Sequence, residues 1–224
     1  MKEVLKSLIR KTPLYYPLRN WLFRRRQKRE LVDWERRGRP LPLPHLAKQG
    51  ILRKYAKQYD LRILVETGTS YGEMIEAMKC FFDRIYSVEI SKELFEKAKN
   101  RFKSYDHVEL IHGDSGKELR NVIGRIGQPA LFWLDGHYSG EGTAKGEKET
   151  PIYAELNQIF DAPDLGHVII IDDARCFGVD PAYPTIEELK KYILSKRRNV
   201  RITVEDDSIR ITPGDLSHLT RGCT

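Results

Sequence analysis

The sequence predicts an α/β fold: a doubly wound, Rossmann-like sheet of seven strands with helices on both faces. Three observations lead to this prediction. Short apolar segments alternate with segments of helical pattern after residue 45. Two apolar segments near the carboxyl end are separated by only three residues, which is too short for a crossover helix. Acids follow several of the apolar segments directly, where an open parallel sheet has its ligand crevice.

Strands and helices are expected in strict alternation. The helix over Ser91–Lys103 has a clear signature, because Ser91 is a favourable N-cap and Leu94, Phe95 and Ala98 share one face. The expected helices are His45–Tyr59, Tyr71–Phe82, Ser91–Lys103, Ser115–Ile123, Pro151–Phe160 and Thr185–Ser195. The expected parallel strands are Leu61–Val65, Arg84–Val88, His107–Ile111, Ala130–Leu134 and Val168–Ile171. Repeated alternation implies right-handed crossovers and a sheet that is covered on both faces.

The last two strands break this rhythm. Val200–Val204 and Ser208–Thr212 flank the three-residue turn Glu205-Asp206-Asp207, so they are expected to form an antiparallel hairpin at the sheet edge. The complete sheet therefore has five parallel strands and a C-terminal antiparallel hairpin.

The chain is expected to divide into residues 1–45, a basic and aromatic segment with a proline-rich linker, and residues 46–224, the α/β domain. Prolines alternate in Pro40–Pro44, which imposes an extended path. Residues 1–39 contain thirteen Lys and Arg against four acids, so the basic charge is concentrated there.

Aromatic and apolar residues lie next to these basic residues in the sequence and indicate what the segment binds. Tyr15, Tyr16, Trp21, Leu22 and Phe23 precede the basic run Arg24–Arg29. This mixture is typical of contact with an anionic membrane surface. RNA or an acidic glycan is an alternative, as is a solvated helix that packs on the domain. Nucleic acid is disfavoured because no RNA-binding signature accompanies the run.

Other features bear on location. No apolar run approaches the length that crosses a bilayer, and no secretory signal is recognisable at the start. The three cysteines, Cys80, Cys176 and Cys223, are widely spaced and are expected to be reduced thiols. We therefore expect a cytoplasmic protein, alternatively one that is peripheral to the inner membrane face. A homo-oligomer is compatible with the sequence.

Acids and glycines at the strand ends indicate a site for a cationic cofactor and a divalent metal. The first strand runs into Glu66-Thr67-Gly68-Thr69-Ser70-Tyr71-Gly72, where the glycines permit a tight turn before a helix. This loop has neither dinucleotide-binding nor Walker spacing. Glu89 follows the second strand at the distance of a ribose-binding acid. Asp114 and Ser115 follow the third strand, where they can meet an adenine amino group.

On these residues the chain resembles class I S-adenosylmethionine-dependent methyltransferases over about residues 46 to 212. It is most similar to the metal-dependent O-methyltransferases, including the macrolide-sugar and catechol types. The resemblance implies a methionine-binding loop formed by Glu66, Gly68, Thr69, Ser70, Tyr71 and Gly72. It implies that Glu89 binds the ribose and that Asp114 and Ser115 contact the adenine. It also implies that Asp135, Asp172 and Asp173 bind Mg²⁺ or another divalent cation.

Candidate catalytic residues follow the fourth strand. His137 and Asp135 are alternative general bases. Lys145 lies in the Gly-, Glu- and Lys-rich stretch Ser139–Lys148, which is expected to act as a lid; Lys145 either contacts an anionic substrate or is a solvated loop lysine. The acceptor side is expected to include Tyr138, Phe177, Tyr183 and the loop Asp180–Pro184.

The function expected from this site is O-methylation of a hydroxyl on a small molecule or glycan, and the expected acceptor is a sugar in a glycan, glycolipid or natural product. One alternative is a hydroxylase on the same fold that uses iron and 2-oxoglutarate, as in the cephalosporin hydroxylase relatives. His137 with Asp135 and Asp172 resembles the ligand set that it needs. A non-catalytic binding module that uses the basic segment is a second alternative.

Overall fold

The computed structural model describes residues 15–136 and 150–214. The chain divides into two compact units, Met1–Gly50 and Ile51–Thr224, and each is described by itself. This division falls inside the helix α3, a few residues after the boundary that we predicted at residue 45. Among the described residues, no helix is both long enough and apolar enough to cross a membrane.

The first unit contains the helix α2 (Tyr15–Arg36) and the start of α3 (His45–Gln58). After α2 the chain turns through Gly38 and Arg39, both with positive φ. The indole N–H of Trp34 donates to the carbonyl of Pro40 at 2.6 Å. Gln27 of α2 lies 2.9 Å from Nδ1 of His45, so a buried amide connects the two helices within this unit.

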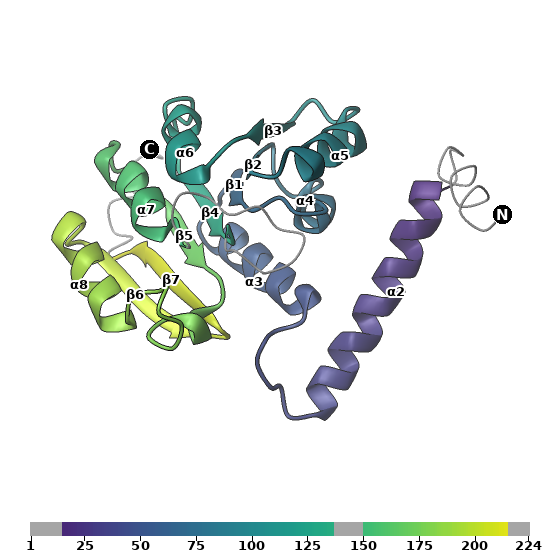
Figure 1. Ribbon diagram of the computed structural model, residues 1–224, viewed down its shortest axis with the longest axis horizontal. Coiled ribbons are helices and arrows are strands. Elements are labelled where there is room, and N and C mark those ends of the chain that lie inside the picture. Colours follow the sequence, from purple (N-terminus) through teal and green to yellow (C-terminus); the bar gives the residue numbers. More distant parts are fainter. Residues whose placement is uncertain (1–14, 137–149, 215–224) are drawn as a thin grey trace, which may run out of the picture. The chain divides into compact units, whose positions relative to one another are not determined.

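The second unit is built on one seven-stranded sheet with the order β3-β2-β1-β4-β5-β7-β6 (Figure 1). The five parallel strands are β1 (Ile63–Thr67), β2 (Arg84–Glu89), β3 (Val108–His112), β4 (Ala130–Leu134) and β5 (Val168–Ile171). The edge hairpin consists of β6 (Val200–Glu205) and β7 (Ser208–Pro213), and β7 pairs antiparallel with β5. The predicted fold class is confirmed.

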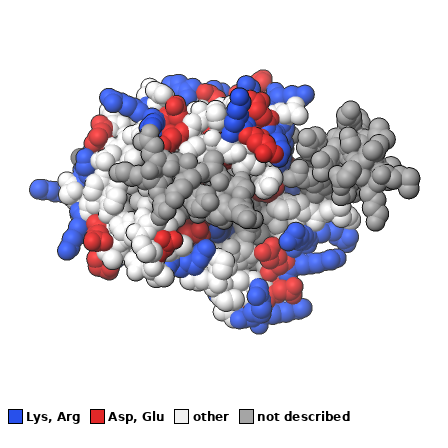
Figure 2. Space-filling model, in the orientation of Figure 1, with Lys and Arg blue, Asp and Glu red and all other residues white. Residues whose placement is uncertain are grey.

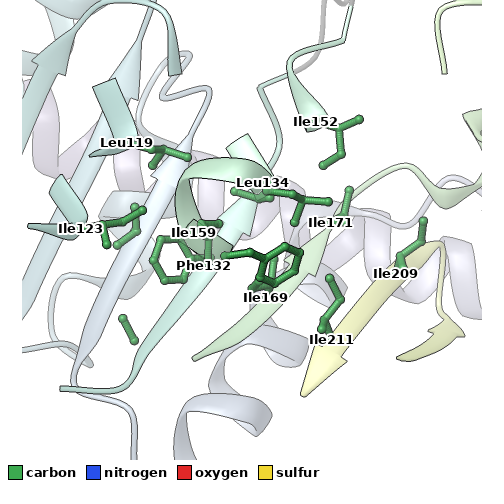
Figure 3. Close-up of a cluster of buried hydrophobic side chains, with 14 of the residues drawn as sticks. Leu119, Ile123, Phe132, Leu134, Ile152, Ile159, Ile169, Ile171, Ile209 and Ile211 are labelled. Atoms are coloured by element: carbon green, nitrogen blue, oxygen red, sulfur yellow. The ribbon is translucent and has the colours of Figure 1, made fainter. Parts of the chain in front are cut away.

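Helices cover both faces of this sheet (Figure 1). They are α4 (Glu73–Met78), α5 (Lys92–Phe102), α6 (Ser115–Ile123), α7 (Ile152–Asp161) and α8 (Ile186–Lys196), with a short 3₁₀ helix, η1 (Ala174–Cys176). Side chains alternate along each strand, so Leu131 and Trp133 of β4 pack with α3, α4 and α5. Phe132 and Leu134 belong to the other core, with α6, α7 and α8, which Figure 3 shows in part.

Two predicted boundaries were wrong. The helix that we expected over Tyr71–Phe82 is confined to α4, because Gly72 has a φ of 74° and caps the helix, and a tighter turn follows Met78. The first strand was placed two residues too early. Glu66 and Thr67 pair with β2 on one side and with β4 on the other, so they belong to β1 although one is an acid.

The strand order positions the site. β1 lies between β2 and β4, and the connections on its two sides run in opposite directions. Ligands of doubly wound sheets bind outside the carboxyl ends of the strands at such a reversal. The loops after β1, β2, β4 and β5 therefore border the place where a ligand is expected to bind.

At the opposite, amino end of the sheet, His167 joins β5 to β4. Its Nδ1 accepts a hydrogen bond from the backbone N–H of Ala130 at 3.0 Å, so the neutral ring holds its proton on Nε2. Burial lowers the pKa of His167 from 6.5 to about 4. The folded state therefore disfavours the charged ring, and the native contact is lost as acid protonates it.

We predict that His167 makes the protein less stable in mild acid. Its contribution is complete above about pH 6.5 and is lost as the pH falls toward 4, by at most about 3 kcal/mol. Urea unfolding at pH 7.5 and pH 4.5 measures this loss. The variant His167→Gln should lose less stability than the wild type over that interval, and equal losses in both proteins would contradict the prediction.

Candidate functional site

A glycine after β1 brings two loops of the site into direct contact. Gly68 has a φ of 83°, and a Cβ placed there would lie 2.6 Å from the carbonyl oxygen of Asp135. Only glycine fits both the backbone angle and the space. The N–H of Gly68 also donates to the carbonyl of Val88 at 2.9 Å. The loop after β1 is thus held between the ends of β2 and β4.

Gly72 has a similar constraint at the start of α4. A Cβ on this residue would lie 2.5 Å from Cε2 of Phe102, whose ring packs beneath the turn. Ser70 and Gly72 both have positive φ, so the chain winds tightly before α4 begins. This compact turn leaves backbone groups close to the strand ends, where a ligand approaches. Tyr71, between them, is exposed.

Glu89 fixes the turn to the end of β2. One carboxylate oxygen accepts from the N–H of Ser70 at 2.7 Å, and the other accepts from the N–H of Ser91 at 2.8 Å. The side chain is buried. Because each carboxylate oxygen has two acceptor sites, both oxygens retain capacity for hydroxyl donors. Glu89 is therefore held rigidly in the position of the predicted ribose acid.

Glu66 is a buried acid at the end of β1, only 2% exposed. Burial raises its pKa from 4.5 to about 8; a hydrogen bond from Ser87 opposes this shift, and the charges of Asp135, Glu89 and Glu73 add to it. The hydroxyl of Ser87 donates to Glu66 at 2.5 Å, and Thr69 lies 2.6 Å from Ser87. When Ser87 donates to Glu66, the hydroxyl of Thr69 donates to Ser87.

Asp114 and Ser115 lie at the end of β3, as predicted. Asp114 caps α6 by accepting from the N–H of Gly116 at 2.9 Å. The hydroxyl of Ser115 donates to Glu155 of α7 at 2.6 Å and is therefore directed into the protein.

Glu155 was missed by the sequence reasoning. Its carboxylate is buried on α7 and lies beside the loop after β4: a Cβ on Gly136 would be 3.3 Å from its Oε1 and 3.1 Å from Oγ1 of Thr67. The available signal was an acid on the apolar face of an amphipathic helix. Glu155 links α6, α7 and the loop that carries Asp135.

Three aspartates meet at the ends of β4 and β5. Asp135, Asp172 and Asp173 each offer a carboxylate oxygen, and these oxygens all lie within 4.8 Å of one another. Asp172 is buried, and its N–H donates to the carbonyl of Leu134 at 3.1 Å, which extends the pairing of β4 with β5. Asp173 stands at the N-cap of η1 but makes no side-chain cap bond, so capping does not explain it.

This donor set fits a hard divalent cation. Oxygen ligands of one Mg²⁺ are about 3 to 4 Å apart, so small side-chain rotations bring the three carboxylates to that spacing. A buried aspartate beside two others also requires nearby positive charge. Arg175 supplies part of it, at 2.8 Å from Oδ1 of Asp173.

The edge hairpin holds the loop that bears these acids. Asp207, in the turn between β6 and β7, accepts from the backbone N–H of Arg175 at 3.0 Å and pairs with its guanidinium group. Its carbonyl accepts from the N–H of Ala174 at 2.9 Å. Arg175 thus bridges Asp173 and Asp207. The sequence indicated only that Asp207 lies in a hairpin turn. Its contact with Arg175 depends on the pairing of β7 with β5.

Aromatic side chains lie beside the acids. The rings of Phe177 and Tyr183 are 5.1 Å apart in an edge-to-face arrangement. Burial raises the pKa of the Tyr183 phenol well above its ordinary value, and the charges of Cys176, Asp173 and Asp180 add to this shift. Tyr183 is therefore a neutral, partly buried ring close to the metal-binding candidates.

The structure brings together most of the predicted site. Residues predicted for the cofactor lie at the ends of β1, β2 and β3, and those predicted for the metal lie at the ends of β4 and β5. His137, Tyr138, Lys145 and the stretch Ser139–Lys148 lie outside the described residues. Asp135 is the candidate base that the structure describes.

Solved structures with the same fold include several methyltransferases. An S-adenosylhomocysteine-bound methyltransferase, PaMTH1 of Podospora anserina, is 18% identical over 83% of this chain and 88% of its own, with a TM-score of 0.54. TomG of Streptomyces achromogenes, an O-methyltransferase solved with S-adenosylmethionine, is 17% identical over 84% and 88%, with a TM-score of 0.54. An O-methyltransferase of Bacillus cereus, in complex with S-adenosylhomocysteine, is 16% identical over 83% and 90%, with a TM-score of 0.55.

These similarities show that the chain has the fold of S-adenosylmethionine-dependent methyltransferases. The resemblance seen in the sequence is thereby confirmed for the fold. No protein-family model matches the chain, and no curated protein sequence is similar to it.

We predict that Glu66 destabilises the folded protein as the pH rises. Because its pKa is raised to about 8, the folded state favours the protonated acid; this stabilisation is complete below about pH 4.5 and is lost as the pH passes 8. The variant Glu66→Gln stays neutral and still accepts from Ser87. Its stability relative to the wild type should therefore increase by on the order of 4 kcal/mol between pH 4.5 and pH 9.

Chemical denaturation of both proteins at pH 5, 7 and 9 gives the comparison. His167 is common to both and cancels from the difference. Parallel pH profiles for wild type and Glu66→Gln would show that Glu66 titrates normally and would contradict the prediction.

Proposed function

We propose that the chain is an S-adenosylmethionine-dependent O-methyltransferase that holds a divalent cation beside its acceptor. The acceptor that we propose is a hydroxyl on a sugar, in a glycan, glycolipid or natural product. The observation that carries the proposal is the separation of the acids into two groups: Glu66 and Glu89 on β1 and β2, and three aspartates after β4 and β5. The methyltransferase fold supports the assignment of the first group to the methyl donor.

The first group suits a cationic methyl donor. Glu89 is positioned to accept from ribose hydroxyls, and the turn from Gly68 to Gly72 lies where the methionine part would bind. The sulfonium of S-adenosylmethionine would favour ionised carboxylates nearby, so its binding is expected to lower the raised pKa of Glu66. Asp114 completes this side at the adenine end.

The second group suits acceptor activation. Asp135, Asp172 and Asp173 would hold the cation, which supplies positive charge that orients a hydroxyl and lowers its pKa. Asp135 or His137 would take the hydroxyl proton as the acceptor oxygen attacks the methyl carbon in line with the departing sulfur. Gly68 contacts the backbone of Asp135, so the chain itself sets the distance between donor and acceptor sides.

The aromatic pair supports a ring as the acceptor. Phe177 and Tyr183 present an edge-to-face pair near Asp173, and flat apolar faces commonly pack against sugars and other rings. In this proposal Lys145 contacts an anionic part of the acceptor.

We predict that cofactor and metal affinities separate by mutation. In calorimetric titrations with S-adenosylhomocysteine and with Mg²⁺, Glu89→Ala should weaken the cofactor product about tenfold or more and leave metal binding nearly unchanged. Asp172→Ala should abolish metal binding and change affinity for the cofactor product by less than about threefold.

Asp164→Ala is the matched control, since it removes an exposed acid at the amino end of β5 and should affect neither titration. Thermal melts verify that each variant is folded. A wild-type protein that binds neither ligand would refute the proposal. Binding of Fe²⁺ with consumption of 2-oxoglutarate would instead assign the site to a hydroxylase.

A further inference from the structure

Helix α2 has two different faces. At 100° per residue, Phe23, Gln27, Leu31 and Trp34 fall on one side of the helix. Gln27 is buried and the other three are half-buried. Trp21, Leu22 and Val32 fall on the opposite side, where Trp21 is 51% and Leu22 54% exposed. Packing therefore accounts for the first face and leaves the second, which we call the Trp21 face, in contact with solvent.

The Trp21 face is strongly basic. It covers about a third of the helix circumference and, among residues 21–36, whose side chains the structure describes, contains Trp21, Leu22, Val32, Arg25, Lys28, Arg29 and Arg36. None of the three acids of α2, Glu30, Asp33 and Glu35, falls within it. The guanidinium group of Arg25 lies 4.5 Å from the ring centre of Trp21, so charge and aromatic surface are directly adjacent. Figure 2 shows several Lys and Arg side chains on the visible part of this helix, beside acids that lie outside the Trp21 face; one of these, Asp33, is 3.8 Å from Arg36.

This combination matches the surface of an anionic bilayer. Indole and aliphatic groups insert at the level of the lipid headgroups, and long basic side chains extend from the same face toward the phosphates. A helix that lies in the plane of the membrane presents such a face over its whole length. The three exposed apolar side chains described on this face are too few for strong insertion by themselves, so attraction between charges must supply most of the binding.

Nucleic acid fits the face less well. Proteins that bind single strands combine several stacking aromatics with a basic groove, whereas the Trp21 face is one side of a convex helix with one exposed aromatic. Asn and Gln are the usual readers of adenine edges in duplex DNA, and Gln27 is on the buried face, so this face offers DNA mainly contacts from basic side chains.

We propose that the Trp21 face of α2 docks the protein onto a membrane surface rich in anionic phospholipid. Docking would place the enzyme beside acceptors in or near the bilayer, but the binding itself is independent of the proposed methyl transfer.

The test is binding of the full chain to vesicles of phosphatidylcholine with and without about 30% phosphatidylserine. Affinity for the anionic vesicles should be about tenfold higher or more, and should decrease when salt screens the charges. Arg25→Glu with Arg29→Glu should reduce binding to the level of neutral vesicles. Glu is a good helix former, so circular dichroism should show that α2 persists.

Lys191→Glu with Arg198→Glu is the control, because it makes the same change of charge on exposed residues of the second unit. The control should bind anionic vesicles within about twofold of the wild type. Tryptophan fluorescence should shift to shorter wavelength on binding, and Trp21→Phe should lose most of this shift. Equal losses of binding in the two double variants would show an effect of net charge alone and would overturn the proposal.

Two further outcomes would also overturn it. A wild-type chain that remains in solution with anionic vesicles has no docking face. Tighter binding to oligouridine than to vesicles, lost in Arg25→Glu with Arg29→Glu, would assign the face to RNA. Titration with S-adenosylhomocysteine should give the same affinity for this variant and the wild type, so failure of membrane docking is distinguishable from failure of the proposed activity.

Discussion

The contact of Gly68 with the carbonyl of Asp135 is the constraint on which the site depends. It exists because β1 and β4 are neighbours at the point where the strand order reverses, and because residue 68 has no side chain. The loop that would bind the methyl donor and the loop that would bind the metal therefore meet through backbone atoms. In a displacement reaction the distance between donor and acceptor strongly affects the rate, and in the proposed reaction rigid backbone would set that distance.

Concentrated negative charge is the second property of the site, and it follows from the first. Burial raises the pKa of Glu66, and Asp135 and Glu89 are close enough for their charges to add to this shift. Buried acids at this density are stable when cations share the space with them. Arg175 is the permanent cation, and it is held by Asp207 from the edge hairpin. A sulfonium beside Glu66 and Glu89 and a divalent ion beside the three aspartates would offset the remaining negative charge of the site.

Sequence alone predicted the features that depend on local pattern. Strand positions follow from short apolar runs, and the clustering of Asp135, Asp172 and Asp173 follows from their place after parallel strands. The terminal hairpin follows from the shortness of its turn, which we predicted to have three residues and which has two, Asp206 and Asp207, because Glu205 pairs with Ser208. Contacts between distant elements were not predictable. Nothing in the sequence near Glu155 indicates that Ser115 and Gly136 lie beside it. Likewise, nothing near Asp207 indicates that this turn residue binds Arg175. Glu66 was predicted to follow its strand, because acids are rare in buried strands. In the structure Glu66 pairs with β2 and with β4, so it belongs to β1.

The central claim is that one site has a cofactor half on β1 to β3 and a metal half on β4 and β5. A crystal structure of the chain with S-adenosylhomocysteine and Mn²⁺ tests it most directly, since anomalous scattering identifies the metal. The account predicts a manganese ion coordinated by Asp135, Asp172 and Asp173, with the ribose hydroxyls of the nucleoside on Glu89. A metal bound elsewhere, or a nucleoside away from Glu89, would contradict it.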